Sequence, residues 1–136
     1  MIRDLRGSIF ERLKHSVQLL AMPAEIQLNL LPSFVCKADE LALEFDHWRE
    51  VSFHNYRNEF SAEQLSAMIE LNGKLDWLTA NGKHHWTEEA VRMSPEWEDV
   101  RHLAAQVLKA FSWTTEIPPS YAHEYIGNPI QRHEEN

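Results

Sequence analysis

The sequence predicts an all-α fold, a single-domain helical bundle of about four main helices with short extra helical turns. Apolar residues recur at steps of three and four along most of the chain, which places them on one face of a helix. No segment shows the alternating, β-branched pattern of a strand. With 136 residues and a hydrophobic fraction of 43%, the chain is long enough to bury a core of its own as one domain.

Recognisable start signals divide the chain into these helices. The segments 8–11 and 61–64 have the spacing of capping boxes, in which a Ser hydroxyl and a Glu or Gln side chain bond the free amides of the first turn. Thr87 and Ser94 can each cap a helix, and Pro95 follows Ser94 at a position where proline is tolerated. We predict main helices over 8–22, 34–57, 61–80 and 94–113, and short turns over 23–31 and 87–93.

Two glycines bear on the predicted helix over 61–80. Gly73 lies inside its apolar pattern and costs about 1 kcal/mol relative to Ala. We expect the helix to continue through Gly73, because close packing against a neighbour would explain a residue without a side chain. Asn81 and Gly82 then supply a left-handed stop.

The pattern divides the chain into a helical bundle domain, residues 1–113, and a Pro-containing tail, residues 114–136. Pro118, Pro119, Gly127 and Pro129 predict an irregular course for this tail. Its apolar residues are too numerous for a simple solvated end, so we expect part of it to pack. It can pack on the bundle or on a neighbouring subunit, and the second arrangement would make the protein a homo-oligomer.

The balance of charge limits the classes of partner. The chain has 13 Lys and Arg against 21 Asp and Glu, a net charge of −8. Such a chain is repelled by nucleic-acid phosphates and by anionic lipid, so we expect neither nucleic acid nor membrane as a partner. The acidity is compatible with a basic protein partner, and equally with a charge that serves solubility alone.

The N-terminal segment and the cysteine content indicate a cytoplasmic protein. Charged residues interrupt the first sixteen positions, which lack the apolar run of a signal peptide. The single Cys36 excludes an internal disulfide. Because Phe34 and Val35 precede it, we expect Cys36 to be a buried, inert thiol rather than a nucleophile.

An acidic cluster between residues 88 and 99 is the preferred partner-binding site. It places five acids against one base, Arg92. Acids at helix starts also stabilise the helix dipole, which explains the cluster without a partner. Trp97 fits a core stripe, whereas Trp86 lies outside any stripe and is the better candidate for an exposed anchor. The candidate partner-binding residues are Trp86, Glu88, Glu89, Glu98 and Asp99.

A second group of residues suggests a metal site. Glu44 and His47 have the Glu-x-x-His spacing of di-iron bundles. At 100° per residue, however, Glu40, Glu44, His47 and His54 cluster on a face far from the apolar stripe of their helix, so we expect them to face water. The candidate metal ligands are Glu40, Glu44, His47, Glu50 and His54.

The function predicted from these patterns is binding rather than catalysis. The sequence contains no Gly-rich phosphate loop, no Gly-x-Ser-x-Gly elbow and no His-Glu-x-x-His helix. His84 and His85 lie in a predicted connection, with no nucleophile placed beside them by spacing. The leading hypothesis is a small acidic non-enzymatic protein-binding domain, an accessory or immunity-like neutralising protein, with no cofactor. The alternative is a helical-bundle protein that binds a metal or small ligand through surface His and Glu residues.

Overall fold

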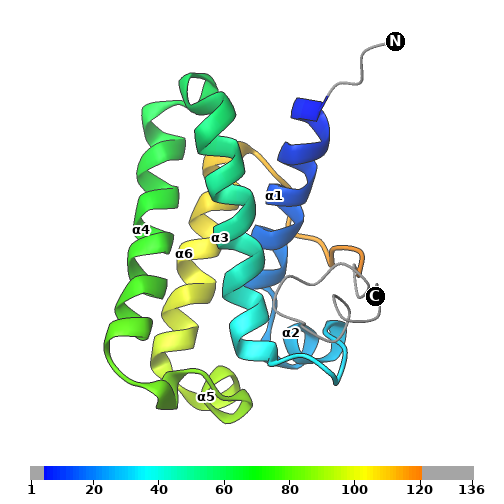
Figure 1. Cartoon of the computed structure of the whole chain (residues 1–136), viewed down its shortest axis with the longest axis vertical. Coiled ribbons are helices and arrows are strands. Elements are labelled where there is room, and N and C mark those ends of the chain that lie inside the picture. The colour runs from blue at the N-terminus through cyan, green and yellow to red at the C-terminus, as the bar shows by residue number, and fades with distance from the viewer. Residues whose placement is uncertain (1–4, 121–136) are drawn as a thin grey trace, which may run out of the picture.

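The computed structural model describes residues 5–120, and every regular element in this range is helical (Figure 1). The predicted all-α bundle is therefore confirmed. The four long helices are α1 (Leu5–Ala21), α3 (Lys37–Tyr56), α4 (Ala62–Ala80) and α6 (Pro95–Phe111). The shorter elements are α2 (Ala24–Leu30), α5 (Glu88–Met93) and the 3₁₀ turns η1 (Arg57–Glu59) and η2 (Lys83–His85).

The long helices pack in the order α3, α1, α6, α4. Helix α1 packs against both α3 and α6, and α6 packs against α4 on its other side. The core between them includes Leu13, Phe45, Leu71 and Trp97, all of which are completely buried. Helices α3 and α4 are joined by η1, but each packs mainly on a different partner. The bundle is therefore open between α3 and α4.

Local capping explains where α4, α5 and α6 begin. The Ser61 hydroxyl accepts a hydrogen bond from the Gln64 amide (3.0 Å), and the Gln64 side chain accepts one from the Ser61 amide (2.9 Å). Thr87 and Ser94 cap α5 and α6 as predicted. The capping box at Ser8 is wrong, because α1 already includes Leu5 and Ser8 lies inside the helix.

A buried glutamine ties three helices together. Gln27, at 0% exposure, donates from Nε2 to the carbonyl oxygens of Leu19 (3.2 Å) and Leu20 (3.0 Å) at the end of α1. Its Oε1 accepts a hydrogen bond from Arg101 Nη1 of α6 (2.8 Å). The last carbonyls of a helix have no partner within it. One α2 side chain thus bonds the end of α1 and fixes α6 beside it.

The segment that follows α6 folds back over α1 and α2. The chain turns at Ser112, whose φ of 57° is left-handed. Gln18 Nε2 then donates to the Thr114 carbonyl (2.8 Å), Pro118 is buried, and the Ser120 hydroxyl donates to the Leu30 carbonyl (3.4 Å). Residues 114–120 therefore lie on the chain's own bundle. The remainder of the predicted tail, 121–136, lies outside the described residues, as do residues 1–4.

None of the helices within residues 5–120 combines the length and the apolar character needed to cross a membrane. Many apolar side chains of the long helices are buried in the bundle core, whereas Leu5, Ile69 and Trp77 are exposed.

Replacing Gln27 with Met tests the tie between α1, α2 and α6. The Gln27→Met variant keeps the side-chain length but removes the hydrogen bond to the Leu20 carbonyl. It also removes one of the bonds of the Leu19 carbonyl, which keeps the Met22 amide, and one of those of the Arg101 guanidinium, which keeps Glu98. We expect its free energy of unfolding in urea to fall by about 2–4 kcal/mol. The matched control is Gln106→Met on the exposed face of α6, with an expected change within about 0.5 kcal/mol. Equal effects at the two positions would contradict the role of Gln27.

The two glycines of the α4 region should respond in opposite directions to alanine. A Cβ at Gly73 would have nothing within 4 Å, so close packing does not explain this glycine. Gly73→Ala should raise the free energy of unfolding by about 0.5–1 kcal/mol through helix propensity. A Cβ at Gly82, where φ is +121°, would lie 2.7 Å from the His84 ring. Gly82→Ala should therefore lower the melting temperature, whereas Gly73→Ala should raise it.

Candidate functional site

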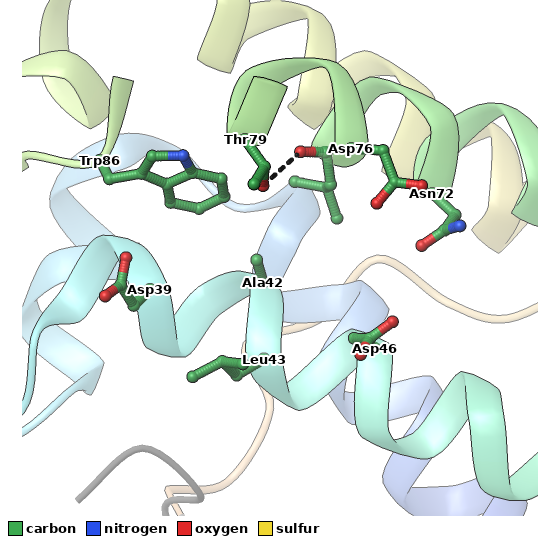
Figure 2. Close-up of a pocket in the computed structure, with 9 residues that line it drawn as sticks. Asp39, Ala42, Leu43, Asp46, Asn72, Asp76, Thr79 and Trp86 are labelled. Carbon is green, nitrogen blue, oxygen red and sulfur yellow. Dashed lines mark hydrogen bonds between the residues drawn. The ribbon is translucent and has the colours of Figure 1, made fainter. Parts of the chain in front are cut away.

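The open side of the bundle forms a groove between α3 and α4, which we call the α3–α4 groove (Figure 2). Its cavity volume is about 390 Å³. It lies where α3 begins and α4 ends. The residues that line it are Asp39, Ala42, Leu43, Asp46, Asn72, Leu75, Asp76, Thr79 and Trp86.

Helical periodicity brings these residues to the groove. Asp39, Ala42 and Asp46 recur at steps of three and four on α3, and Asn72, Asp76 and Thr79 do the same on α4. Each set therefore forms one stripe on its helix. Figure 2 shows Ala42 pointing from α3 toward α4, midway between Asp39 and Asp46.

The walls of the groove are mixed in character. Leu75 is 5% exposed and contributes to the core, whereas Leu43 is 37% exposed and stands at the rim. The Thr79 hydroxyl donates to the Leu75 carbonyl (3.2 Å), a bond within α4. The floor is thus apolar, and the polar groups at the rim are mainly carboxylates.

Trp86 closes one end of the groove. The turn at Gly82 and η2 bring the chain back from the end of α4, and the Trp86 ring then packs edge-on against Trp97, with ring centroids 5.6 Å apart. Trp97 is completely buried, and its indole donates to the His85 carbonyl (2.7 Å). Trp86 is therefore half-buried and held by the core, and it is less exposed than its position outside any stripe suggested.

The groove carries negative charge. Asp39, Asp46 and Asp76 are all exposed. Arg49 donates to Asp46 (2.8 Å), and within residues 5–120 it is the one Lys or Arg in an ion pair with any of the three. Three carboxylates against one guanidinium favour a cationic ligand at this site.

The partner-binding residues predicted from the sequence are spread over several elements. Of the five, Trp86 alone lines the groove. Glu88 and Glu89 are exposed on α5, and Glu98 and Asp99 are exposed on α6.

Three of these acids have basic neighbours that reduce their charge. Glu88 lies 3.8 Å from Arg92, and Glu98 lies 3.1 Å from Arg101. Asp99 lies 3.5 Å from Lys74, whose pKa is raised chiefly by its hydrogen bond with Glu96. This acidic surface is therefore partly neutralised within the fold.

The candidate metal ligands fall on two different sides of α3. Glu40 and Glu44 are 1% and 7% exposed, which corrects the expectation that they face water. His47, Glu50 and His54 are exposed. Among the described residues, no group of three or more His, Cys, Asp or Glu side chains is arranged to hold a metal ion.

The burial of Glu44 has a clear physical cause. Pro118 and Pro119 of the returning segment, together with α1, line a small pocket beside it. The Trp48 indole donates to Glu44 Oε1 (3.3 Å), and the Arg12 guanidinium lies 5.1 Å from the centre of the Trp48 ring. A helical wheel of α3 alone cannot show that this side of the helix is covered by residues far along the chain.

The same pocket is lined by a half-buried histidine. His15 and Ser16 of α1 line it, and its cavity volume of about 20 Å³ is large enough for about one water molecule. Burial lowers the pKa of His15 below its ordinary value of 6.5, although the neighbouring Glu11 carboxylate opposes this shift. The pocket is too small for a substrate, so the α3–α4 groove is the stronger candidate site.

The surroundings of Cys36 do not activate it as a nucleophile. It is exposed, which corrects the expectation of a buried thiol. Desolvation raises the pKa of the Cys36 thiol, although a hydrogen bond from the Asp39 backbone amide opposes this shift, and the raised pKa disfavours the reactive thiolate.

Comparisons with models of protein families, with curated proteins and with solved structures find no match for this chain. A function can therefore be argued only from geometry and charge. The α3–α4 groove is the site where shape and charge together are most informative, because one cavity has an apolar floor, an aromatic end and three carboxylates.

The lowered pKa of His15 predicts a pH dependence of stability. Between pH 6.5 and the lower pKa of the folded state, the unfolded chain binds more protons than the folded chain does. The contribution of His15 to stability is therefore full at neutral pH and decreases as the pH falls through this range. Urea titrations of the wild type and of His15→Gln between pH 5 and 7.5 should show a shallower slope in the variant. Parallel curves would exclude His15 as a source of the slope.

Proposed function

We propose that this chain is a non-enzymatic binding domain that holds a basic protein partner in the α3–α4 groove. The observation that carries the proposal is the combination of Asp39, Asp46 and Asp76 around an apolar floor that ends at Trp86. Carboxylates of this kind guide and orient a cationic partner, whereas a tryptophan at the edge of a pocket is a common anchor of binding energy.

The shape of the site favours a protein over a small molecule. A volume of about 390 Å³ is within the range of small-ligand pockets, but those pockets enclose most of the ligand. This groove is open along its length, between two helices that pack on other partners. An open groove suits a side chain or a segment that remains attached to a larger surface.

The acids of α5 extend the proposed surface. Helix α5 packs against α3 and lies at the same end of the bundle as the groove (Figure 1). Glu88 and Glu89 are exposed there. In this proposal they increase the rate of encounter with a basic partner, and the groove supplies the contacts that hold it. Masking a basic protein in this way is the role of an accessory or neutralising protein, and we place it in the cytoplasm, where a lone cysteine stays reduced.

Neutralising the groove should weaken capture of the partner. In Asp39→Asn/Asp46→Asn, two carboxylates of the α3 stripe become amides of almost the same size. Immobilised wild-type protein should retain one stoichiometric basic protein from an extract of its own cells, and salt between 0.1 M and 1 M should release it as the Debye length falls from about 10 Å to about 3 Å. The double variant should release that protein at lower salt and retain less of it.

The matched control is Glu63→Gln/Glu70→Gln. These two exposed acids also lie seven residues apart on one helix, α4, but they do not line the groove. The control variant removes the same net charge and includes one first-turn acid, as the test variant does. Equal retention by the two variants would show that net charge alone attracts the partner, and the groove would then be excluded as the site.

A further inference from the structure

The spacing of the groove carboxylates indicates the form of the occupant. We infer that the α3–α4 groove receives a single amphipathic helix, with Lys or Arg at positions i and i+7 and an apolar residue at i+3 or i+4. This inference rests on the proposed function, since it assumes a protein partner in the groove.

The i and i+7 positions follow from the α3 wall. Asp39 and Asp46 are seven residues apart, which is about two helical turns or about 10 Å. Residues seven apart on a partner helix have the same spacing and lie on the same face. A helix that runs along the groove therefore presents one cation to each carboxylate at once. Figure 2 shows Asp39 and Trp86 toward one end of the groove, and Asp46 and Asp76 toward the other.

The apolar position follows from the floor. Ala42 lies midway between Asp39 and Asp46, and Leu75 faces it from α4. On the partner helix, a residue three or four positions after the first cation lies opposite Ala42 and Leu75. A branched apolar side chain there contacts Ala42 and Leu75, with Leu43 at the rim and Trp86 at the end.

A helix fits the groove better than an extended segment does. An extended peptide gains affinity by pairing its backbone with an exposed sheet edge, and residues 5–120 contain no strand. The walls here are helices whose backbone groups are bonded internally. A helix satisfies its own backbone and needs only side-chain contacts. It also packs between α3 and α4 in the way that helices of a bundle pack, with axes about 8–10 Å apart.

Two peptides of identical composition test this inference. Both are fluorescently labelled, 18 residues long, capped at each end and built on an Ala and Gln background with Leu at positions 9 and 10. The first carries Lys at 6 and 13; the second carries Lys at 6 and 11, which places the two cations about 140° apart around the helix. Fluorescence anisotropy measures their affinity for the full chain, and circular dichroism measures helicity on binding.

The first peptide should bind about two- to fivefold more tightly than the second, the effect of one exposed ion pair. Its helicity should increase on binding. Asp39→Asn/Asp46→Asn should abolish this preference, and Glu63→Gln/Glu70→Gln should preserve it. Leu43→Lys, a change at the exposed rim, should weaken both peptides by placing a cation where the ligand is cationic.

The outcomes separate this inference from the proposed function. Equal affinity for the two peptides, or binding without a gain of helix, overturns the helical occupant. The proposed function survives that result if the captured protein still depends on Asp39 and Asp46. If neither the peptides nor the captured protein distinguishes Asp39→Asn/Asp46→Asn from its control, both proposals fail together.

Discussion

The hydrogen bonds of Gln27 are the constraint on which the rest of this bundle depends. Helix α1 ends at Ala21, and its final carbonyls have no partner within the helix. The Gln27 amide donates from α2 to two of them, those of Leu19 and Leu20, and its own oxygen accepts from the Arg101 guanidinium of α6. Since α3 and α6 both pack on α1, the place of α1 determines the place of each. The segment 114–120 is then laid over the same two helices, α1 and α2.

The groove is a consequence of this order of packing. Helix α3 packs mainly on α1, and α4 packs mainly on α6. The two helices that η1 joins therefore bury their apolar faces without packing closely on each other. The sides they turn toward one another can therefore carry Asp39, Asp46 and Asp76, which a closed core would exclude. A carboxylate in a core would have to be paired or protonated, whereas these three stay in contact with water.

The features that the sequence predicts correctly are those that depend on residues close together along the chain. The Ser61 capping box, the Ser94 start of α6 and the burial of Trp97 are properties of single helices, and the structure has each of them. Ser8 shows the limit of such signals, because a serine and a glutamate three residues later also occur inside a helix. Trp86 lies outside any apolar stripe of the sequence, but periodicity along one helix cannot show the groove that it closes.

What the sequence could not show depends on contacts between distant segments. Asp39 and Asp46 look like ordinary solvent-facing residues until α4 is placed opposite them. Glu44 looks equally solvated until Pro118 and Pro119 return across its side of α3. In both cases the helical wheel gives the side of α3 on which the side chain lies. It cannot show which distant segment of the chain packs against that side.

Arg49 has more than one partner at the edge of the groove. Its guanidinium is shared between Asp46 (2.8 Å) and Glu50 (3.1 Å), and it lies 5.6 Å from the centre of the Phe53 ring. A partner cation that takes Asp46 therefore leaves Arg49 with a second carboxylate and an aromatic face. Binding at this point exchanges one ion pair for another and strands no charge, so the groove can open to a ligand without the electrostatic penalty of an abandoned cation.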